Sequence, residues 1–218
     1  MERRGAGLVL DAHRGRADKV LMPAANALKG VDPNLISVIA LVLALVVGIL
    51  TYYSFEDWQL LLPIISILVL VSGFLDALDG KVARLAGKAG KRGDFIDHVF
   101  DRYADIFMIG GVVVSSWCNV YLGILALLGV LMTSYMGTQA QALGIGRMYA
   151  GLLGRADRIV LMFLVPLVQW GYVLITGDKF VDLGWVQFSM FEIMMLWFAL
   201  VGNLTVVQRG IATWKELK

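Results

Sequence analysis

Long apolar segments alternate with short polar ones along most of this 218-residue chain. Crossing the roughly 30 Å hydrocarbon core of a bilayer takes about 20 helical residues. Six segments reach or approach that length: 35–53, 60–75, 94–117, 121–143, 159–176 and 185–207. Because backbone groups in hydrocarbon must form their hydrogen bonds within the same segment, we expect each one to be a helix. The pattern therefore predicts an all-α integral membrane protein with six transmembrane helices.

The residues before the first apolar segment show a different pattern. Between residues 17 and 29, apolar side chains recur at helical spacing, at Val20, Leu21, Ala24, Ala25 and Leu28. This spacing is typical of an amphipathic helix that lies along a bilayer surface. Pro33 disfavours a helical residue before it and so marks a boundary. We therefore divide the chain into an N-terminal segment, 1–31, and a six-helix membrane domain, 32–218.

Composition and loop charge add a protein class and an orientation. Hydrophobic residues make up 59% of the chain and the mean hydropathy is +0.75, which excludes a soluble globular domain. Lys and Arg gather in both tails and in the loops after the second and fourth apolar segments. By the positive-inside rule, this is a multi-pass cell-membrane protein whose termini and polar motif face the cytoplasm. The single cysteine, Cys118, excludes an intramolecular disulfide and a cysteine-based metal site.

Four aspartates flank the loop between the second and third apolar segments. Asp76 and Asp79 are three residues apart, and Asp97 and Asp101 are four apart. At about 3.6 residues per turn, each pair lies on one face of its helix. If the two faces meet, the four carboxylates cannot all be ionised without cations, and Mg²⁺ or Mn²⁺ suits an all-oxygen site. The alternative is pairing with nearby lysine and arginine side chains at a wet helix end.

The residues between these two pairs favour the metal interpretation. Gly80 and Ala83 are small enough to let a ligand approach the backbone, and Arg84 carries a guanidinium suited to a phosphate. Together the residues form the pattern Asp76-x-x-Asp79-Gly80-x-x-Ala83-Arg84, eight residues, Gly93, three residues, Asp97, three residues, Asp101. This pattern resembles the signature of the CDP-alcohol phosphotransferases, integral membrane enzymes that make phospholipid headgroups.

The resemblance implies a reaction and a set of residue roles. In that family an acceptor hydroxyl attacks the β-phosphorus of a CDP-linked lipid, and CMP leaves. Two divalent ions, Mg²⁺ or Mn²⁺, would be held by Asp76, Asp79, Asp97 and Asp101, and Asp101 would also act as the general base. Two ions can neutralise the developing charge, and a carboxylate can take the acceptor proton. The resemblance further implies a homodimer among membrane lipids, with no nucleic-acid partner.

Nucleotide-binding residues follow from the same resemblance. The nucleotide site would be lined by Gly80, Ala83 and Arg84, with Arg84 on a phosphate. The run Pro33-Asn34-Leu35-Ile36-Ser37 resembles the family's entry to the first span, where Asn34 and Ser37 would help to bound the cytidine pocket. Taken alone, this run is also an ordinary helix start, capped by Asn34 or by the residue before Pro33.

A pair of arginines suggests the acceptor. Arg155 and Arg158 lie three residues apart at the start of the fifth apolar segment and could clamp a phosphomonoester. They are similar to the Arg-x-x-Arg element of the phosphatidylinositol-phosphate synthases, which implies inositol phosphate as the acceptor. The alternative is that the two arginines only anchor the cytoplasmic end of this helix, as the positive-inside rule favours. The chain departs from those synthases at Met136, where they tend to carry lysine, so glycerol 3-phosphate or serine stays open as the acceptor.

Two further polar residues lie near the aspartates in the sequence, and a second function also fits aspartates in spanning helices. His98 falls on a helix flank away from the aspartates, and we expect a structural or headgroup contact. Asp105 continues the i, i+4 series from Asp101, and pairing with Arg102 is favoured over contact with the acceptor. A small metal-ion transporter would also place aspartates in spanning helices, but it favours broken helices and inverted repeats, and we find neither pattern in the sequence.

Overall fold

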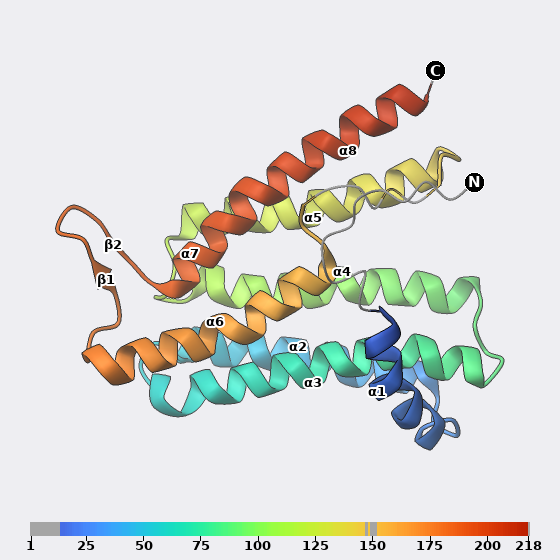
Figure 1. Ribbon diagram of the computed structural model, residues 1–218, viewed down its shortest axis with the longest axis horizontal. Coiled ribbons are helices and arrows are strands. Elements are labelled where there is room, and N and C mark those ends of the chain that lie inside the picture. The colour runs from blue at the N-terminus through green and yellow to red at the C-terminus, as the bar shows by residue number, and fades with distance from the viewer. Residues whose placement is uncertain (1–13, 147, 149–151, 218) are drawn as a thin grey trace.

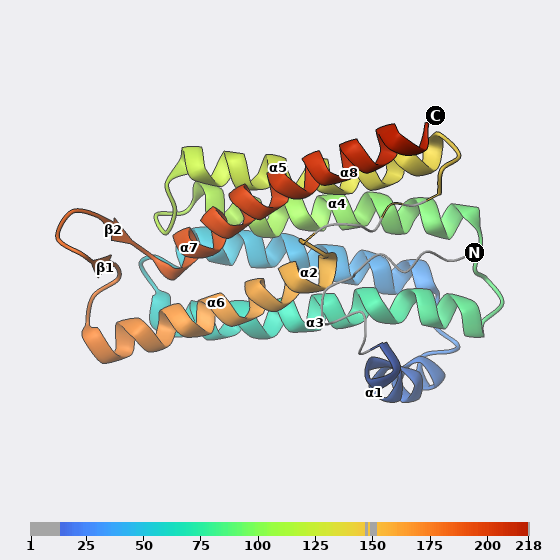
Figure 2. The same cartoon turned by 45° about the horizontal axis from the view of Figure 1, so that its top comes forward.

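The computed structural model describes residues 14–146, 148 and 152–217, and their regular structure is almost entirely helical. The elements are α1 (Arg14–Ala27), α2 (Pro33–Tyr53), α3 (Trp58–Leu85), α4 (Lys91–Val114), α5 (Val120–Ala142), α6 (Arg155–Thr176), β1 (Val181–Asp182), β2 (Gln187–Phe188), α7 (Met190–Trp197) and α8 (Asn203–Glu216). One π-helical turn, Phe198–Gly202, joins α7 to α8. Helices α2 to α5 run along the long axis of the molecule, and α6 and α7–α8 cross them obliquely (Figures 1 and 2).

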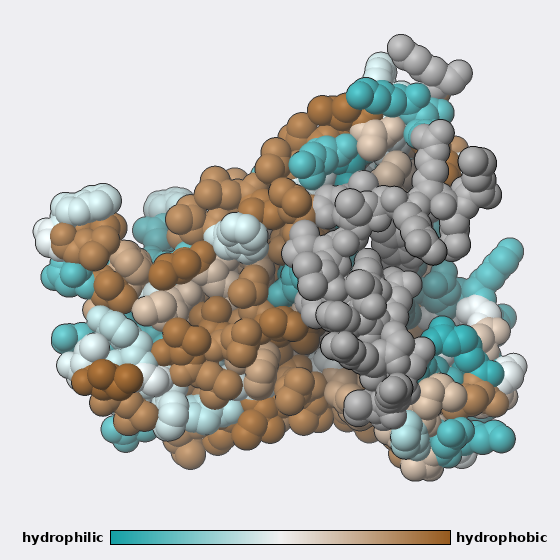
Figure 3. Space-filling view, in the orientation of Figure 1, coloured by the Kyte–Doolittle hydropathy of each residue, from teal (hydrophilic) through white to brown (hydrophobic). Residues whose placement is uncertain are grey.

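Five of the described helices are long and apolar enough to cross a membrane. They are α2, α3, α5, α6 and the continuous helix Met190–Glu216. Helix α4 has 24 residues, but the charged side chains of its first half keep it outside this group. On the face shown in Figure 3, apolar residues form a broad region with hydrophilic residues toward both ends of the long axis. The chain is therefore a multi-pass helical membrane protein, and the sixth crossing stays a prediction.

The last long helix begins later than the sequence pattern predicts. Before it, β1 and β2 pair antiparallel in a short hairpin, whose turn contains Gly184 at φ +83°. The helix starts at Met190, and its N-cap is Ser189, whose hydroxyl accepts a hydrogen bond from the Glu192 N–H. The predicted start at residue 185 was wrong because Trp185 is apolar but lies in the hairpin turn, 84% exposed. Hydropathy alone does not distinguish such a turn from a helix start.

Helix α1 lies beside the second half of α3 (Figure 2). Of its described side chains, Leu21 and Ala25 are buried in one cluster with Leu78 and Val82 of α3. Part of the apolar face predicted for a bilayer surface therefore packs on the protein instead. Contact of α1 with the membrane stays a prediction, and residues 1–13 of the N-terminal segment lie outside the described residues.

Glycines set the spacing between α2 and α4. A Cβ added to Gly111 would lie 2.6 Å from the Gly48 Cα, and a Cβ added to Gly48 would meet the Phe107 carbonyl oxygen. Both obstacles are backbone atoms, so relief requires a whole helix to move. Gly129 of α5 approaches the α7–α8 helix similarly, with the Phe198 carbonyl oxygen 3.2 Å from its added Cβ. Small residues thus allow close helix packing within this chain, as they do in other membrane proteins.

Gly111→Ala should destabilise the fold, because the new methyl group would meet the Gly48 backbone and force α2 and α4 apart. We expect a loss of about 1–3 kcal/mol, the range for overpacked cores, seen as a lower midpoint of thermal unfolding in detergent. Gly110→Ala is the matched control, since nothing lies within 4 Å of its added Cβ and alanine favours a helix. Equal midpoints for the two variants would show that the Gly48–Gly111 contact does not set the helix spacing.

Candidate active site

The length of α3 places the first two motif aspartates near one edge of the membrane domain. Helix α3 has 28 residues and is about 42 Å long at 1.5 Å per residue, longer than the roughly 30 Å hydrocarbon core. Asp76 lies about 27 Å along the axis from Trp58 at that rise. A charged side chain costs less free energy at this depth than at the bilayer centre. Asp76 and Asp79 are therefore held at the end of the apolar region.

The acidic faces of α3 and α4 meet inside the bundle. One carboxylate oxygen from each of Asp76, Asp79 and Asp97 lies within 4.8 Å of the other two. A second group with the same spacing joins Asp97, His98 and Asp101. Oxygen donors at this spacing fit Mg²⁺ or Mn²⁺. Because Asp97 is common to both groups, the donor set suits two neighbouring divalent ions.

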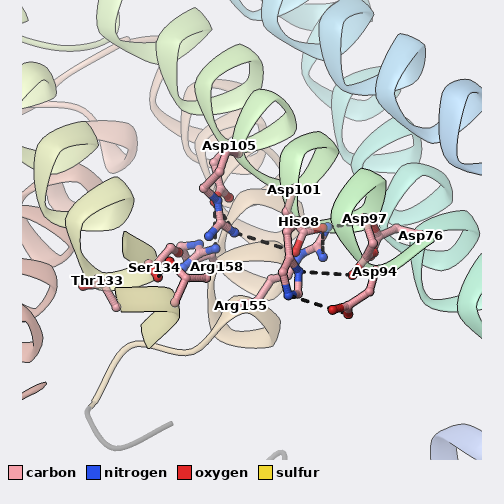
Figure 4. Close-up of polar contacts among 12 residues, drawn as sticks. Asp76, Asp94, Asp97, His98, Asp101, Asp105, Thr133, Ser134, Arg155 and Arg158 are labelled. Atoms are coloured by element: carbon pink, nitrogen blue, oxygen red, sulfur yellow. Dashed lines mark hydrogen bonds and ion pairs between the residues drawn. The ribbon is translucent and has the colours of Figure 1, made fainter. Parts of the chain in front are cut away.

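His98 does not lie away from the aspartates, and that expectation was wrong. Its Nε2 is 3.7 Å from an Asp94 oxygen and its Nδ1 is 3.6 Å from an Asp97 oxygen (Figure 4). Helical side chains lean toward the preceding turn, and this direction brings the imidazole over the acidic start of α4. An imidazole nitrogen suits first-row transition metals better than Mg²⁺, which prefers oxygen.

Arg155, the first residue of α6, reaches between the two acidic helices (Figure 4). Its guanidinium donates to an Asp76 oxygen over 2.6 Å and also pairs with Asp101. The Asp101 side chain is only 5% exposed, whereas that of Arg155 is 30% exposed. The contact supplies positive charge to carboxylates that would be strongly destabilised if they were buried and unpaired. It also ties α3, α4 and α6 together at one point.

A second ion-pair network lies further along α4 and α6. Arg158 donates to Asp105 over 2.8 Å (Figure 4). Arg102 lies 3.4 Å from the same carboxylate oxygen. Arg158 is 3% exposed. The expected pairing of Asp105 with Arg102 is confirmed. The sequence did not predict the pairing with Arg158. Its only signal there was that Asp105 lies four residues after Asp101, and Arg158 three residues after Arg155.

Residues at the start of α2 contribute unequally to the site. The Ser37 hydroxyl donates to the Asp79 carboxylate and so joins α2 to the acidic group. Asn34 is exposed, and its backbone N–H donates to the Asp32 carboxylate over 3.0 Å. Asp32 is therefore the helix cap, the role that this residue type commonly fills. Of the two predicted nucleotide-binding residues, Ser37 contacts an aspartate and Asn34 lies at the surface.

The remaining predicted nucleotide-binding residues occupy the end of α3, beyond the aspartates. Arg84 is exposed, and Gly80 and Ala83 are partly buried. A Cβ added to Gly80 would lie 3.8 Å from a terminal nitrogen of Arg84, so these two residues share one side of the helix. The small side chains leave the backbone accessible beside a guanidinium, an arrangement suited to a phosphate group.

A pocket between α2, α3, α4 and α6 opens at the aspartates. Its polar lining includes Asp76, Asp79, Asp97 and Arg155. Its apolar lining includes Leu41, Met108 and Ile159. One pocket thus offers charged groups beside a hydrocarbon-like surface. Such a site can hold a charged headgroup and part of the hydrocarbon attached to it.

Comparison with known proteins identifies the family. The sequence model of the CDP-alcohol phosphatidyltransferases matches residues 31–207, a range that includes all four motif aspartates. The chain belongs to the CDP-alcohol phosphatidyltransferase family. This phosphatidyltransferase is accordingly an enzyme that transfers substituted phosphate groups in phospholipid biosynthesis.

Similar proteins cover most of the phosphatidyltransferase. Archaetidylinositol phosphate synthase of Pyrococcus horikoshii is 32% identical over 162 residues, 73% of this chain and 80% of the relative. The protein of the same name from Methanothermobacter thermautotrophicus is 33% identical over 151 residues, 69% of this chain and 70% of the relative. Phosphatidylinositol phosphate synthase of Cutibacterium acnes is 29% identical over 214 residues, 94% of this chain and 97% of the relative.

Solved structures share the fold of the phosphatidyltransferase. The crystal structure of Mycobacterium tuberculosis phosphatidylinositol phosphate synthase (PgsA1) with CDP-DAG bound aligns with a TM-score of 0.68 at 21% identity, over 90% of this chain and 94% of that chain. The same protein in complex with manganese and citrate gives a TM-score of 0.66 at 22% identity, over 89% and 88%. The helical arrangement described above is therefore that of a known membrane enzyme.

Asp97→Asn should weaken Mn²⁺ binding more than any other single change in the acidic cluster, because Asp97 belongs to both groups of candidate ligands. We expect the dissociation constant to rise by more than about 100-fold, beyond the 10–100-fold effect of changes outside the ligand set. Titration of the free Mn²⁺ electron paramagnetic resonance signal with protein in detergent measures it. Asp57→Asn, at the exposed opposite end of α3, is the control. Equal affinity in both variants would remove Asp97 from the metal site.

Proposed function

We propose that this phosphatidyltransferase moves a phosphatidyl-type group from a CDP-linked lipid to a hydroxyl of inositol phosphate and releases CMP. The observation that carries the proposal is the convergence of Asp76, Asp79 and Asp97 from two helices within metal-ligand distance, with Arg155 beside them. The names of the archaeal and bacterial relatives support inositol phosphate as the acceptor. Some of these names refer to an archaetidyl lipid and others to a phosphatidyl lipid. The donor is therefore either a CDP-linked archaeal ether lipid or a CDP-linked diacyl lipid.

In this proposal, the carboxylates hold the cofactor and one of them moves a proton. The ligands of two Mg²⁺ or Mn²⁺ ions are Asp76, Asp79, Asp97 and Asp101. Such ions, when bound, neutralise the diphosphate and stabilise the leaving CMP oxygen. The manganese complex of the mycobacterial synthase supports the binding of a divalent ion in this fold. Asp101 acts as the general base and takes the proton of the attacking acceptor hydroxyl.

The nucleotide is bound by residues that surround the first aspartate pair. Gly80 and Ala83 leave room for the diphosphate, and Arg84 pairs with a phosphate oxygen. Asn34 and Ser37 bound the cytidine pocket. The hydrogen bond from Ser37 also fixes the orientation of Asp79, as residues behind a metal ligand commonly do. The CDP-DAG complex of the mycobacterial synthase supports a CDP-lipid in this fold.

The acceptor phosphate is bound by Arg155 and Arg158 at the start of α6. Arg155 lines the pocket and is partly exposed, so it makes the direct contact. Arg158 is buried against Asp105 and adds positive electrostatic potential at the acceptor phosphate. Met136 stands where those synthases tend to carry lysine, so this chain has one cation fewer at that position. For that reason, glycerol 3-phosphate or serine is the second candidate acceptor. Membership of a transferase family argues against the metal-ion transporter.

The arrangement in the membrane is part of the same proposal. We place α4 across the bilayer as the sixth span, because it lies beside α2 and α5 along the same axis (Figure 1). An even number of crossings puts α1 and the end of α8 on one side, and both do lie toward the same end of the molecule (Figure 1). The basic loops support a cytoplasmic position for that end and for the active site. The homodimer implied by the family resemblance belongs to this proposal as well.

Asp101→Asn should lower the rate of CMP release by about 10²–10⁴-fold, the usual contribution of a general base. The CDP-lipid should still bind, because the amide keeps the size of the side chain and the other aspartates stay in place. Parallel assays of turnover and of CDP-lipid binding in detergent separate the two effects. Asp178→Asn, in the exposed turn after α6, is the control. Turnover near that of the unmodified enzyme would exclude Asp101 as the base.

A substrate panel tests the function as a whole. CDP-diacylglycerol and a CDP-linked archaeal ether lipid are each combined with inositol phosphate, glycerol 3-phosphate, serine or inositol, and CMP is measured with Mn²⁺ or with EDTA. We expect CMP only with inositol phosphate and none with EDTA. Faster release with another acceptor would overturn the choice of acceptor. No CMP from any combination would overturn the proposed function.

A further inference from the structure

Arg155 pairs with one candidate metal ligand in each half of the acidic cluster. One terminal nitrogen of its guanidinium lies 2.6 Å from an Asp76 oxygen, and the other pairs with Asp101. Asp76 belongs to the first group of candidate metal ligands and Asp101 to the second. A single side chain from α6 therefore spans both groups (Figure 4).

A guanidinium and a divalent ion compete for these two carboxylates. An ion such as Mg²⁺ binds a carboxylate oxygen at about 2.1 Å and takes the lone pairs that an arginine N–H would use. Two cations at neighbouring positions also repel one another, and the repulsion is strong where water is excluded. The Asp76 and Asp101 side chains are 24% and 5% exposed, so solvent screens this repulsion poorly. Repulsion and competition for lone pairs therefore favour binding of an ion with Arg155 moved aside.

The position of Arg155 allows such a movement. It is the first residue of α6, its side chain is 30% exposed, and it already lines the pocket. Rotation of the side chain can take the guanidinium off the carboxylates without unwinding the helix, because it changes no backbone torsion of α6. The freed group presents several N–H donors in a plane, the geometry that binds a phosphate in two places at once.

We propose that Arg155 is an exchangeable cation of this site: divalent metal displaces it from Asp76 and Asp101, and the displaced guanidinium then binds the phosphate of the acceptor. The second step rests on the proposed function, whereas the first concerns the metal alone. Metal therefore binds before the acceptor. Because coupling between two ligands is reciprocal, an acceptor phosphate must also strengthen metal binding by the factor by which metal strengthens phosphate binding.

The first step is tested by Mn²⁺ titration of three variants of the full chain in detergent, with the free Mn²⁺ resonance signal as the readout. Arg155→Gln removes the competing charge and should lower the Mn²⁺ dissociation constant at least tenfold. Arg155→Lys keeps the charge and should bind Mn²⁺ like the unmodified protein. Arg158→Gln removes a charge three residues away that pairs with Asp105 instead, and its effect should be much smaller. Thermal unfolding midpoints show which variants are folded.

The second step is tested by repeating the titration with inorganic phosphate as the probe. Phosphate should tighten Mn²⁺ binding in the unmodified protein and in Arg155→Lys, but not in Arg155→Gln. Unchanged or weaker Mn²⁺ binding by folded Arg155→Gln would overturn the exchange, and CMP release by the unmodified enzyme would still support the proposed function. An equal effect of phosphate on all variants would overturn the second step alone. The absence of CMP release, with tighter Mn²⁺ binding by Arg155→Gln, would overturn the proposed function and leave the exchange standing.

Discussion

Compensation of buried negative charge is the constraint on which the rest of the structure depends. Asp79, Asp101 and Asp105 are all less than a tenth exposed, and they lie in helices that pack within an apolar bundle. Carboxylates in such surroundings need cations or hydrogen bonds close by, because an unpaired buried charge is strongly destabilising. The chain meets this need with Arg155 and Arg158, which pair with aspartates of α3 and α4. The charge requirement explains why α6 begins beside the acidic cluster.

Close packing gives this charge arrangement a fixed geometry. Gly48 and Gly111 bring α2 and α4 into backbone contact, and the Ser72 hydroxyl of α3 donates to the Ala40 carbonyl of α2 over 2.9 Å. These contacts hold three helices in register around the aspartates. The Ser37 hydroxyl can then reach Asp79 from α2. Packed helices hold a functional group in position more accurately than a loop does. A site that binds several charged ligands requires this accuracy.

In the proposed function, one site handles a lipid and a water-soluble acceptor together. The pocket has carboxylates and a guanidinium on one side and side chains such as Leu41 and Ile159 on the other. The length of α3 places this boundary near the end of the hydrocarbon region, where a phospholipid headgroup lies. A CDP-linked lipid can keep its chains in the bilayer while its diphosphate meets the aspartates. In the same proposal, the water-soluble acceptor approaches from the exposed side of Arg155.

The sequence by itself determined the class of protein and the chemistry of its centre. Apolar length predicts spanning helices, and the spacing of Asp76, Asp79, Asp97 and Asp101 predicts two acidic faces, because both depend only on local geometry. Hydropathy missed the start of the last helix, since an apolar residue such as Trp185 fits a turn as well as a helix. Only the tertiary structure decided which arginine side chains pair with the carboxylates. The pairs Arg155–Asp76 and Arg158–Asp105 join residues far apart in the chain, and helix packing, which no local pattern encodes, brings them together.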